Sequence, residues 1–349
     1  MLTPTLRAWL DNNALLLDQT SDLTSELFQQ LATSDLFRIG VPSELGGLGG
    51  SILDAINALS QVATHSLTAA FMFWGHRTYI EILLQASSEQ LIKEELVLLL
   101  SGQLAGATGL SNAMKFLSGI EELQVKGCKH GDSWHISGKL HWVTNLQHSG
   151  FRIVTVIEPD DGSEPFIASI ASNQAGVTLS PELSLMGMQG SATAAIVFDD
   201  VKLRDVQVIH PSARQYLPLL RPHFLGLQCG MALGMVARTL NESKIKLNNV
   251  LHSQWEEANS EFRQVNRSLL EGIGSGQFIQ QPEKLFRLRL ALINLAQRCM
   301  QLELMQAGGK AYLSPHGDQI ARRWRECAFL PLVTPSVTQL TQQLSRRKK

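Results

Sequence analysis

The sequence predicts an α+β multidomain protein, with an N-terminal helical domain over residues 1–100, a central small β-barrel over 101–205 and a C-terminal helical bundle over 206–349. Apolar residues recur three or four positions apart at both ends of the chain, as in amphipathic helices. Between Ser133 and Ile157 they alternate with polar residues, as in half-buried strands. Because no helical pattern separates the short strands, a small barrel or sandwich is favoured over a doubly wound sheet.

Composition and charge exclude several classes of function. The 30 Lys and Arg residues nearly balance the 31 Asp and Glu residues, so no overall field would attract nucleic acid or an anionic membrane. The 4 cysteines lie far apart without a CxxC pair, which argues against a disulfide framework or a metal site and suits the cytoplasm. The N-terminus lacks a signal-peptide pattern, and the charge-free apolar runs are too short to span a bilayer.

The first hundred residues predict helices that one loop interrupts. This loop, Ile39 to Gly50, contains five glycines and a proline. It carries neither a P-loop motif nor a strand-borne GxGxxG, so a simple turn is favoured over a phosphate-binding loop. The helix predicted from Leu67 to Leu84 is apolar on nearly every side and is expected to be buried. His76 lies in it, where a hydrogen-bonded structural histidine is commoner than a catalyst.

The middle of the chain predicts short strands. From Trp134 to Thr144 the bulky apolar side chains fall on even positions, which predicts one face of a strand, with a hairpin turn at Ser137-Gly138. Further strands are predicted over 123–126, 151–157, 166–170, 177–179 and 194–198. The loops 102–112 and 186–193 are rich in small residues, so either they let a ligand approach main-chain amides or they are ordinary glycine turns.

From Gln215 onward the chain is predicted to be helical again. Gly226, Gly230 and Gly234 lie about one helical turn apart and leave a ridge without side chains, so another element is expected to pack closely there. The helix predicted from Pro282 to Met305 has two apolar faces. Such a helix lies at the centre of a bundle or at an oligomer interface.

Four motifs occur in an order that is typical of one flavoprotein family. They are Val41-Pro42-x-Glu44-x-Gly46-Gly47, Trp142-Val143-Thr144-Asn145, Met186-Gly187-Met188-x-Gly190-Ser191-x-Thr193 and Gln306-Ala307-Gly308-Gly309. Together they resemble the acyl-CoA dehydrogenase family over nearly the whole chain. The resemblance implies FAD as cofactor, with FMN or a transiently bound reduced flavin as alternatives. It also implies a homodimer or homotetramer.

The resemblance assigns the flavin-binding positions one by one. Trp142 and Thr144 would lie beside the flavin ring, and Thr108 would hydrogen-bond the flavin from the first barrel loop. The segment Gln306, Gly308 and Gly309 would hold the adenine half, often across a subunit boundary. The strand pattern leaves a second interpretation of Trp142, because this residue shares its predicted face with core residues and would then be a core side chain.

The sequence departs from the family at the catalytic base. Dehydrogenation needs a carboxylate that removes the α-proton of the substrate, and the position of the usual glutamate falls on Thr334. A minority of the family carries the base on the first bundle helix, where His223 is the matching position and the predicted catalytic residue. The Arg-x-Gln-Phe-Gly segment that binds the FAD pyrophosphate in the family is not recognisable here.

Three functions follow from the resemblance and its departures. The first is a flavin-dependent oxidoreductase of fatty acid metabolism that acts on an acyl-CoA or similar thioester, by α-proton removal and β-hydride transfer, and passes electrons to an acceptor. The second is a flavin-dependent monooxygenase that receives reduced flavin from a reductase, uses oxygen, and has His76 or His223 as a polar contact. The third is a catalytically silent oligomeric scaffold.

Overall fold

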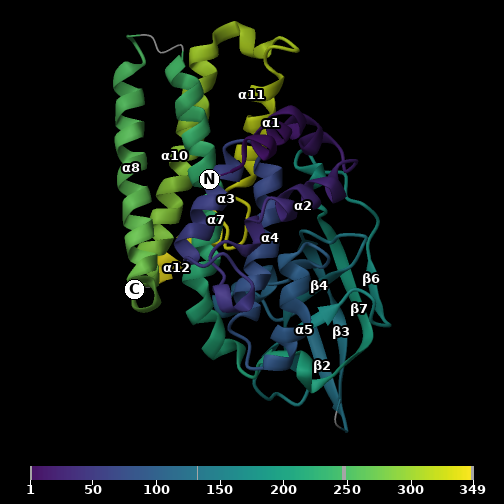
Figure 1. Ribbon diagram of the computed structural model, residues 1–349. Helices are drawn as coiled ribbons and strands as arrows, with labels where there is room; N and C mark the ends of the chain where they lie inside the picture. The colour runs from purple at the N-terminus through teal and green to yellow at the C-terminus, as the bar shows by residue number, and fades with distance from the viewer. Residues whose placement is uncertain (1, 132, 246–248, 347–349) are drawn as a thin grey trace.

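A computed structural model describes residues 2–131, 133–245 and 249–346, and the parts of the predicted bundle at 246–248 and 347–349 lie outside it. Figure 1 shows a sheet on one side, a helical bundle on the other, and the N-terminal helices packed between and above them. The N-terminal helices are α1 (Pro4–Gln19), α2 (Thr24–Thr33), α3 (Ile52–Ala63), α4 (Leu67–Leu83) and α5 (Glu89–Leu100).

The strands follow in the middle of the chain. They are β1 (Ala105–Thr108), β2 (Val125–His130), β3 (Ser133–Val143), β4 (Phe151–Pro159), β5 (Phe166–Ala171), β6 (Val177–Leu179), β7 (Ala194–Leu203) and β8 (Val208–His210). They form one sheet in the order β6-β7-β3-β2-β4-β5-β8, with β1 parallel to β4. One short helix, α6 (Ser111–Leu117), follows β1.

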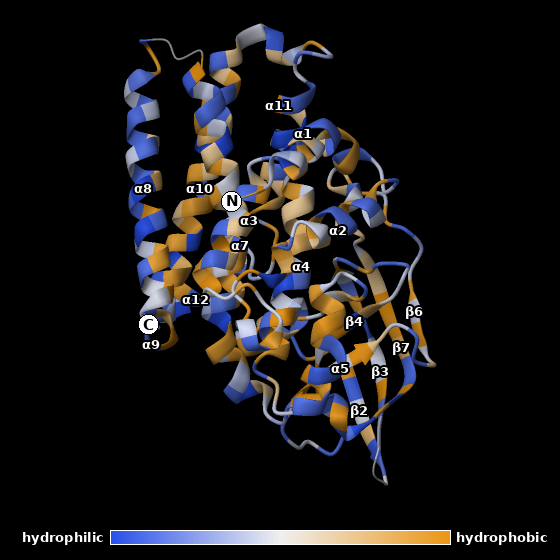
Figure 2. Ribbon diagram, viewed as in Figure 1, coloured by the Kyte–Doolittle hydropathy of each residue, from blue (hydrophilic) through white to orange (hydrophobic). Residues whose placement is uncertain are grey.

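The C-terminal part is a helical bundle. Its elements are α7 (Ala213–Ile245), α8 (His252–Gly274), α9 (Gln277–Gln280), α10 (Pro282–Ala307), α11 (Asp318–Phe329) and α12 (Val337–Arg346). Figure 2 shows that α8, at the outer edge, is mostly hydrophilic, whereas α7 and α10 carry more apolar residues.

The order of helices, strands and helices confirms the predicted fold class. The buried apolar side chains form one cluster through all three parts, so the domain boundaries at 100 and 205 stay predictions.

The central element is α4, which lies between the sheet and the bundle (Figure 1) and contacts β1, α3 and α7. Every residue from Leu67 to Leu83 is buried, as its apolar composition predicts. Glycines permit the close approach to the sheet, since a Cβ on Gly75 would lie 2.9 Å from Thr144 Cγ2. A Cβ on Gly106 of β1 would lie 2.6 Å from Tyr79 Cβ. These contacts fix the end of β3 against α4.

The glycine-rich loop closes on itself. The Gly49 amide donates to Val41 O at 2.8 Å and the Gly40 amide donates to Gly49 O at 2.9 Å. The fully buried Arg77 of α4 then donates to Gly40 O at 3.1 Å. Main-chain and side-chain donors thus hold the loop as a turn on α4.

The structure corrects the predicted hairpin turn at Ser137-Gly138. The strand β3 runs unbroken from Ser133 to Val143. Its pairing with β7 shifts in register between Ile136 and Gly138, so the chain continues past this position without turning back. A second shift lies between Leu140 and Val143, which pair with Ile196 and Ala194. An extra residue in one strand of a pair is a β-bulge, and it turns the following side chains to the other face.

The glycine ridge of α7 is closely packed, as the sequence predicts, and the element that packs on it at Gly230 and Gly234 is α3. A Cβ on Gly234 would lie 2.3 Å from Ser60 O and 2.5 Å from Ala63 Cβ. We therefore expect Gly234→Ala to lower the free energy of unfolding by about 1–3 kcal/mol through overpacking, although alanine favours helices. Denaturant unfolding measures this loss. The matched control is Gly309→Ala, where no atom lies within 4 Å of the new Cβ, and an equal loss in both variants would contradict close helix packing.

Candidate functional site

A cavity of about 360 Å³ lies where α4, the sheet and the bundle meet. Its walls come from segments that are far apart in the sequence. The lining residues are Phe71 and Trp74 of α4, Thr108, Ser111, Trp142 and Thr144 of the sheet region, Leu185 to Met188, Ser191 and Thr193 before β7, Phe224 of α7, and Arg325, Ala328, Phe329 and Leu332 to Thr334 of the C-terminal part.

Three of the predicted flavin residues line this cavity together. Thr108 ends β1, and Trp142 and Thr144 lie at the end of β3. Thr144 is buried, and its Oγ1 donates to Ser191 O at 2.9 Å. Trp142 is 64% exposed, because the β-bulge before Val143 turns its indole away from the core. The interpretation of Trp142 as a core side chain is therefore wrong.

Aromatic side chains close another part of the cavity. Phe71 and Trp74 stack with ring centroids 5.5 Å apart, and the edges of Phe329 and Phe224 pack against them at 4.8 and 5.3 Å respectively. Trp74 Nε1 is buried and has no hydrogen-bond partner among the described residues. A buried donor normally has a partner, so this one fits a ligand with a hydrogen-bond acceptor.

A pair of hydroxyl groups occupies the position that the resemblance gives to the base. Ser111 Oγ donates to Thr334 Oγ1 at 2.8 Å, and both residues line the cavity. Gln228 Nε2 donates to Thr334 O at 2.8 Å, and the buried Arg289 donates to Val333 O at 2.9 Å. The main chain at Thr334 is therefore held firmly. Sequence reasoning missed Ser111, Gln228 and Arg289, because no local pattern marks contacts across such distances in the chain.

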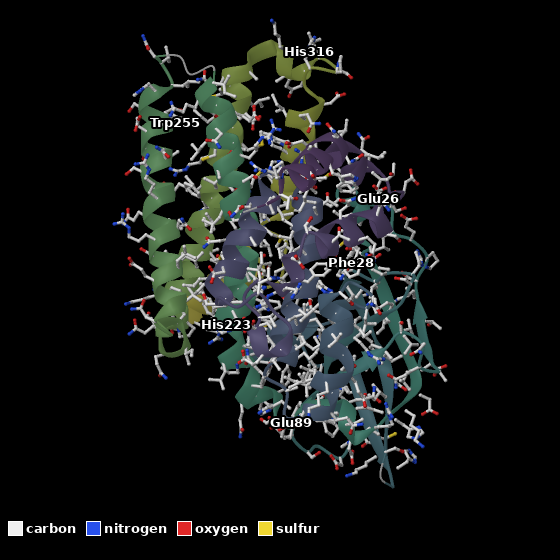
Figure 3. The ribbon with its side chains drawn as sticks, viewed as in Figure 1. Glu26, Phe28, Glu89, His223, Trp255 and His316 are labelled. Atoms are coloured by element: carbon white, nitrogen blue, oxygen red, sulfur yellow. The ribbon has the colours of Figure 1, made fainter. Side chains whose placement is uncertain are left out.

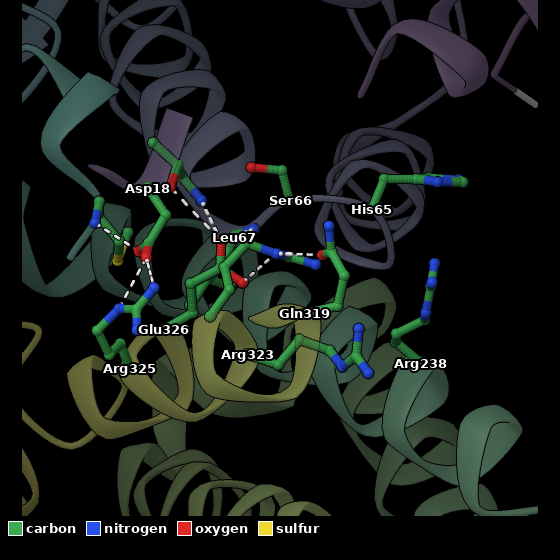
Figure 4. Close-up of polar contacts among 12 residues, drawn as sticks. Asp18, His65, Ser66, Leu67, Arg238, Gln319, Arg323, Arg325 and Glu326 are labelled. Atoms are coloured by element: carbon green, nitrogen blue, oxygen red, sulfur yellow. Dashed lines mark hydrogen bonds and ion pairs between the residues drawn. The ribbon is translucent and has the colours of Figure 1, made fainter. Parts of the chain in front are cut away.

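Arg325 is the one charged side chain among the described residues that line the cavity. Figure 4 shows its guanidinium joined to Asp18, a fully buried residue of α1, with Nε and Nη2 at 2.8 and 2.5 Å from Oδ2. Asp18 Oδ1 also accepts a hydrogen bond from the Met188 amide at 2.9 Å. One carboxylate thus holds both the arginine and the loop before β7 at the cavity.

Comparison with known proteins agrees with this architecture. Residues 2–103 match the family described as acyl-CoA dehydrogenase, N-terminal domain. Probable acyl-CoA dehydrogenase YngJ of Bacillus subtilis is 29% identical over 197 residues, which are 53% of this chain and 50% of that protein. Mitochondrial isovaleryl-CoA dehydrogenase of Pongo abelii is 24% identical over 191 residues, 53% of this chain and 44% of that protein. In sequence, the chain matches about half the length of these curated relatives.

The match in structure extends over nearly the whole chain. A glutaryl-coenzyme A dehydrogenase in complex with glutaryl-CoA superposes with a TM-score of 0.80 at 15% identity, covering 98% of this chain and 94% of the other. Butyryl-CoA dehydrogenase from Megasphaera elsdenii gives 0.78 at 16% identity, covering 100% and 99%. Residues 2–103 thus belong to the acyl-CoA dehydrogenase N-terminal domain family, and the whole chain has the acyl-CoA dehydrogenase fold. Another similar structure is KijD3 with FMN and an amino-keto sugar nucleotide, with 0.82 at 18% identity and coverage of 99% and 91%.

In this chain with the acyl-CoA dehydrogenase fold, the predicted base His223 is not among the residues that line the cavity. Figure 3 shows His223 on the bundle at the end opposite Trp255. Its Nδ1 lies 2.8 Å from Oε1 of the buried Glu81, whose other oxygen accepts from Arg77 at 2.9 Å. Burial alone would raise the pKa of Glu81, but the bonds from His223 and Arg77 outweigh it and lower the pKa to about 2. His223 thus has an ionised partner, and its role as a base stays a prediction.

The remaining predicted cofactor residues lie apart from the cavity. Gln306 is in the last turn of α10, and Gly308 and Gly309 begin the turn that follows it. A Cβ on either glycine would meet no atom within 4 Å, so these positions are open. Thr108, Trp142 and Thr144 are therefore brought together, whereas the adenine-binding assignment of Gln306, Gly308 and Gly309 stays a prediction.

His76 is a structural residue that joins three elements of the fold. Its Nε2 lies 3.0 Å from Leu99 O, and its Nδ1 accepts from the Gly106 amide at 2.9 Å, so α4 is tied to α5 and β1. Burial lowers the pKa of His76 to about 3, so the ring is neutral near pH 7. Both ring nitrogens are occupied, which leaves neither for a ligand.

The lowered pKa of His76 predicts a pH dependence of stability. Between pH 6.5 and about 3 the unfolded chain binds a proton that the folded chain does not, so the free energy of unfolding falls as the pH is lowered. The slope from this residue approaches about 1.4 kcal/mol per pH unit. Denaturant unfolding at several pH values should show this slope for the unaltered chain and for the exposed-site control His316→Gln. It should be reduced in His76→Gln, and equal slopes in all three would contradict the assignment.

No helix of the described ranges is long and apolar enough to cross a membrane.

Proposed function

We propose that this chain binds a flavin in the cavity and uses it to oxidise an acyl-CoA or a similar acyl substrate. One observation carries the proposal. The family resemblance assigns Thr108, Trp142 and Thr144 to the flavin ring. These three residues line the same cavity as a group of aromatic side chains from α4, α7 and α11. A bound flavin supplies hydride or electron acceptance, which protein side chains do not offer.

The wall formed by these residues fits a flat ring. The exposed indole of Trp142 offers an apolar face for stacking. Because Thr144 Oγ1 donates its hydrogen to Ser191 O, the same oxygen has lone pairs left for an N–H of a ligand. Packing of α4 behind Thr144 keeps this side chain in place, as the contact with Gly75 shows.

The aromatic part of the cavity lining fits the substrate. Phe71, Trp74, Phe224 and Phe329 offer aromatic surface to an apolar acyl group. The unpaired Trp74 Nε1 provides a donor for a carbonyl or another acceptor on that group. Among the solved structures that superpose on this chain, the glutaryl-coenzyme A dehydrogenase holds glutaryl-CoA, an acyl thioester.

A second candidate is a flavin-dependent monooxygenase, and the Ser111–Thr334 hydroxyl pair favours it. Hydroxyl groups donate and accept hydrogen bonds but do not take a carbon-bound proton near neutral pH, whereas a carboxylate does. An oxygenation that begins with a reduced flavin requires no α-proton removal by this wall. The related KijD3 structure contains FMN together with a sugar nucleotide.

Absorbance of the purified protein separates these reactions. Anaerobic loss of flavin absorbance on adding short and medium acyl-CoA thioesters supports the dehydrogenase. Binding of supplied reduced flavin followed by reaction with oxygen supports the monooxygenase. Protein that binds no flavin in either redox state would overturn both proposals and leave the silent scaffold.

A further inference from the structure

A second cavity of about 240 Å³ adjoins the first one. The two share Ser111 and Trp142 as lining residues, so they lie next to each other. The shared walls come from the start of α6 and the end of β3. In contrast to the aromatic end of the first cavity, this one is lined by polar side chains, among them Asn112, Lys115, Glu121 and His141.

Lys115 is held towards this second cavity by a short polar network. Its Nζ lies 2.6 Å from Glu121 Oε1, and Asn112 Nδ2 donates to Glu121 Oε2 at 3.3 Å. Asn112 also donates to Glu122 O at 2.9 Å, which fixes the chain after α6. The Lys115 and Glu121 side chains are each 34% exposed, so both reach solvent and a ligand has access to them.

We propose that the second cavity binds the phosphate of a flavin mononucleotide whose ring lies in the first cavity, with Lys115 as the principal phosphate ligand and His141 beside it. This inference rests on the proposed function, because it requires the ring at Trp142. A lysine ammonium is a compact cation with three donors, of which Glu121 uses one, so two remain for phosphate oxygens. The ribityl chain of the flavin would then pass Ser111.

Glu121 orients the Lys115 ammonium, but its negative charge disfavours phosphate binding. Burial alone would raise its pKa, but hydrogen bonds from Lys115 and Asn112 lower the pKa, so Glu121 is ionised near pH 7. Its charge repels a phosphate and competes for Lys115. Removing that charge while keeping the side-chain shape should therefore tighten phosphate binding, opposite in sign to the loss of Lys115.

A monophosphate suits the rest of the chain better than a dinucleotide. The arginine-containing segment that holds the pyrophosphate in the family is not recognisable in this sequence. Ser111, Asn112 and Lys115 of the second cavity belong to α6, and His141 and Trp142 belong to β3. The phosphate site is thus built from α6 and β3 of the same chain.

Quenching of flavin fluorescence tests the site without any turnover. Dissociation constants are measured for riboflavin, FMN and FAD with the unaltered chain, Lys115→Met, Lys115→Arg and Glu121→Gln. The matched control is Lys93→Met on the exposed face of α5, where Lys93 pairs with Glu89. We expect the unaltered chain to bind FMN about 10- to 100-fold more tightly than riboflavin, the range of a charged hydrogen bond.

The variants should change only the preference for phosphate. Lys115→Met should abolish the difference between FMN and riboflavin while riboflavin binds as before, and Lys115→Arg should keep the difference. Glu121→Gln should enlarge it several-fold, and Lys93→Met should leave it unchanged. Equal affinities for FMN and riboflavin in the unaltered chain, or a preference that survives Lys115→Met, would overturn the phosphate site but leave the ring site intact. Failure of all three flavins to bind would overturn the proposed function itself.

Discussion

The flavin bound to the Thr334→Glu variant is expected to be reduced by an acyl-CoA, without oxygen, about 100- to 10,000-fold faster than the flavin of the unaltered chain. This factor is the usual contribution of a general base. Reduction is seen as loss of the flavin absorbance. Thr334 lines the same cavity as Trp142 and Thr144, and its main chain is fixed by Gln228 and Arg289. A carboxylate there would face the substrate beside the flavin wall. Stopped-flow absorbance measures the rate.

Two comparisons make the Thr334→Glu result specific. Thr334→Gln has nearly the same shape and also breaks the bond from Ser111, but it carries no base. It should react no faster than the unaltered chain. Equal rates in Thr334→Glu and Thr334→Gln would contradict the idea that the cavity places this position next to the substrate α-carbon.

Loss of Glu326 is expected to have the largest effect on stability. Glu326 is buried on α11, where its Oε1 accepts from the Leu67 amide at 3.0 Å and its Oε2 accepts from the buried Arg322 at 2.5 Å. Figure 4 shows this network beside the Asp18–Arg325 pair. Glu326→Ala leaves the Arg322 charge and the start of α4 without their partner, so the free energy of unfolding should fall by about 3–5 kcal/mol.

Denaturant unfolding of three proteins tests this effect. The exposed-site control Glu89→Ala breaks a surface pair with Lys93 and should cost less than about 1 kcal/mol. The double variant Arg322→Met with Glu326→Leu removes both charges together and should recover much of the stability. A loss in Glu326→Ala no larger than that in Glu89→Ala would show that this buried pair does not hold α11 against α4.

Local patterns in the sequence predict most of the fold. Helical spacing predicted the buried α4 and the two-faced α10. The glycine spacing predicted a closely packed face of α7, but not that α3 packs there. The strand alternation alone grouped Trp142 with core residues, because a β-bulge depends on the pairing of two strands and not on the local alternation. A period-two pattern therefore placed this side chain on the wrong face.

The site was predictable only in part. Family motifs identified Thr108, Trp142 and Thr144, which the fold brings to one wall. The contact of Asp18 with Arg325 joins residues 307 positions apart, and neither residue belongs to a motif that marks the pair. Such contacts arise from packing of whole elements, so single-sequence patterns do not contain them. The same holds for the Ser111–Thr334 pair, separated by 223 positions.

Flavin binding by the Trp142→Ala variant is the most direct test of the flavin site. In a titration followed by the visible flavin spectrum, the unaltered chain should bind one flavin per chain, with the band shift of a ring in an apolar site. Trp142→Ala should weaken binding about tenfold or more, whereas Trp324→Ala, a half-exposed tryptophan of α11, should leave it unchanged. Equal flavin affinity in all three proteins, or no binding by the unaltered chain at any concentration, would contradict a flavin site at Trp142.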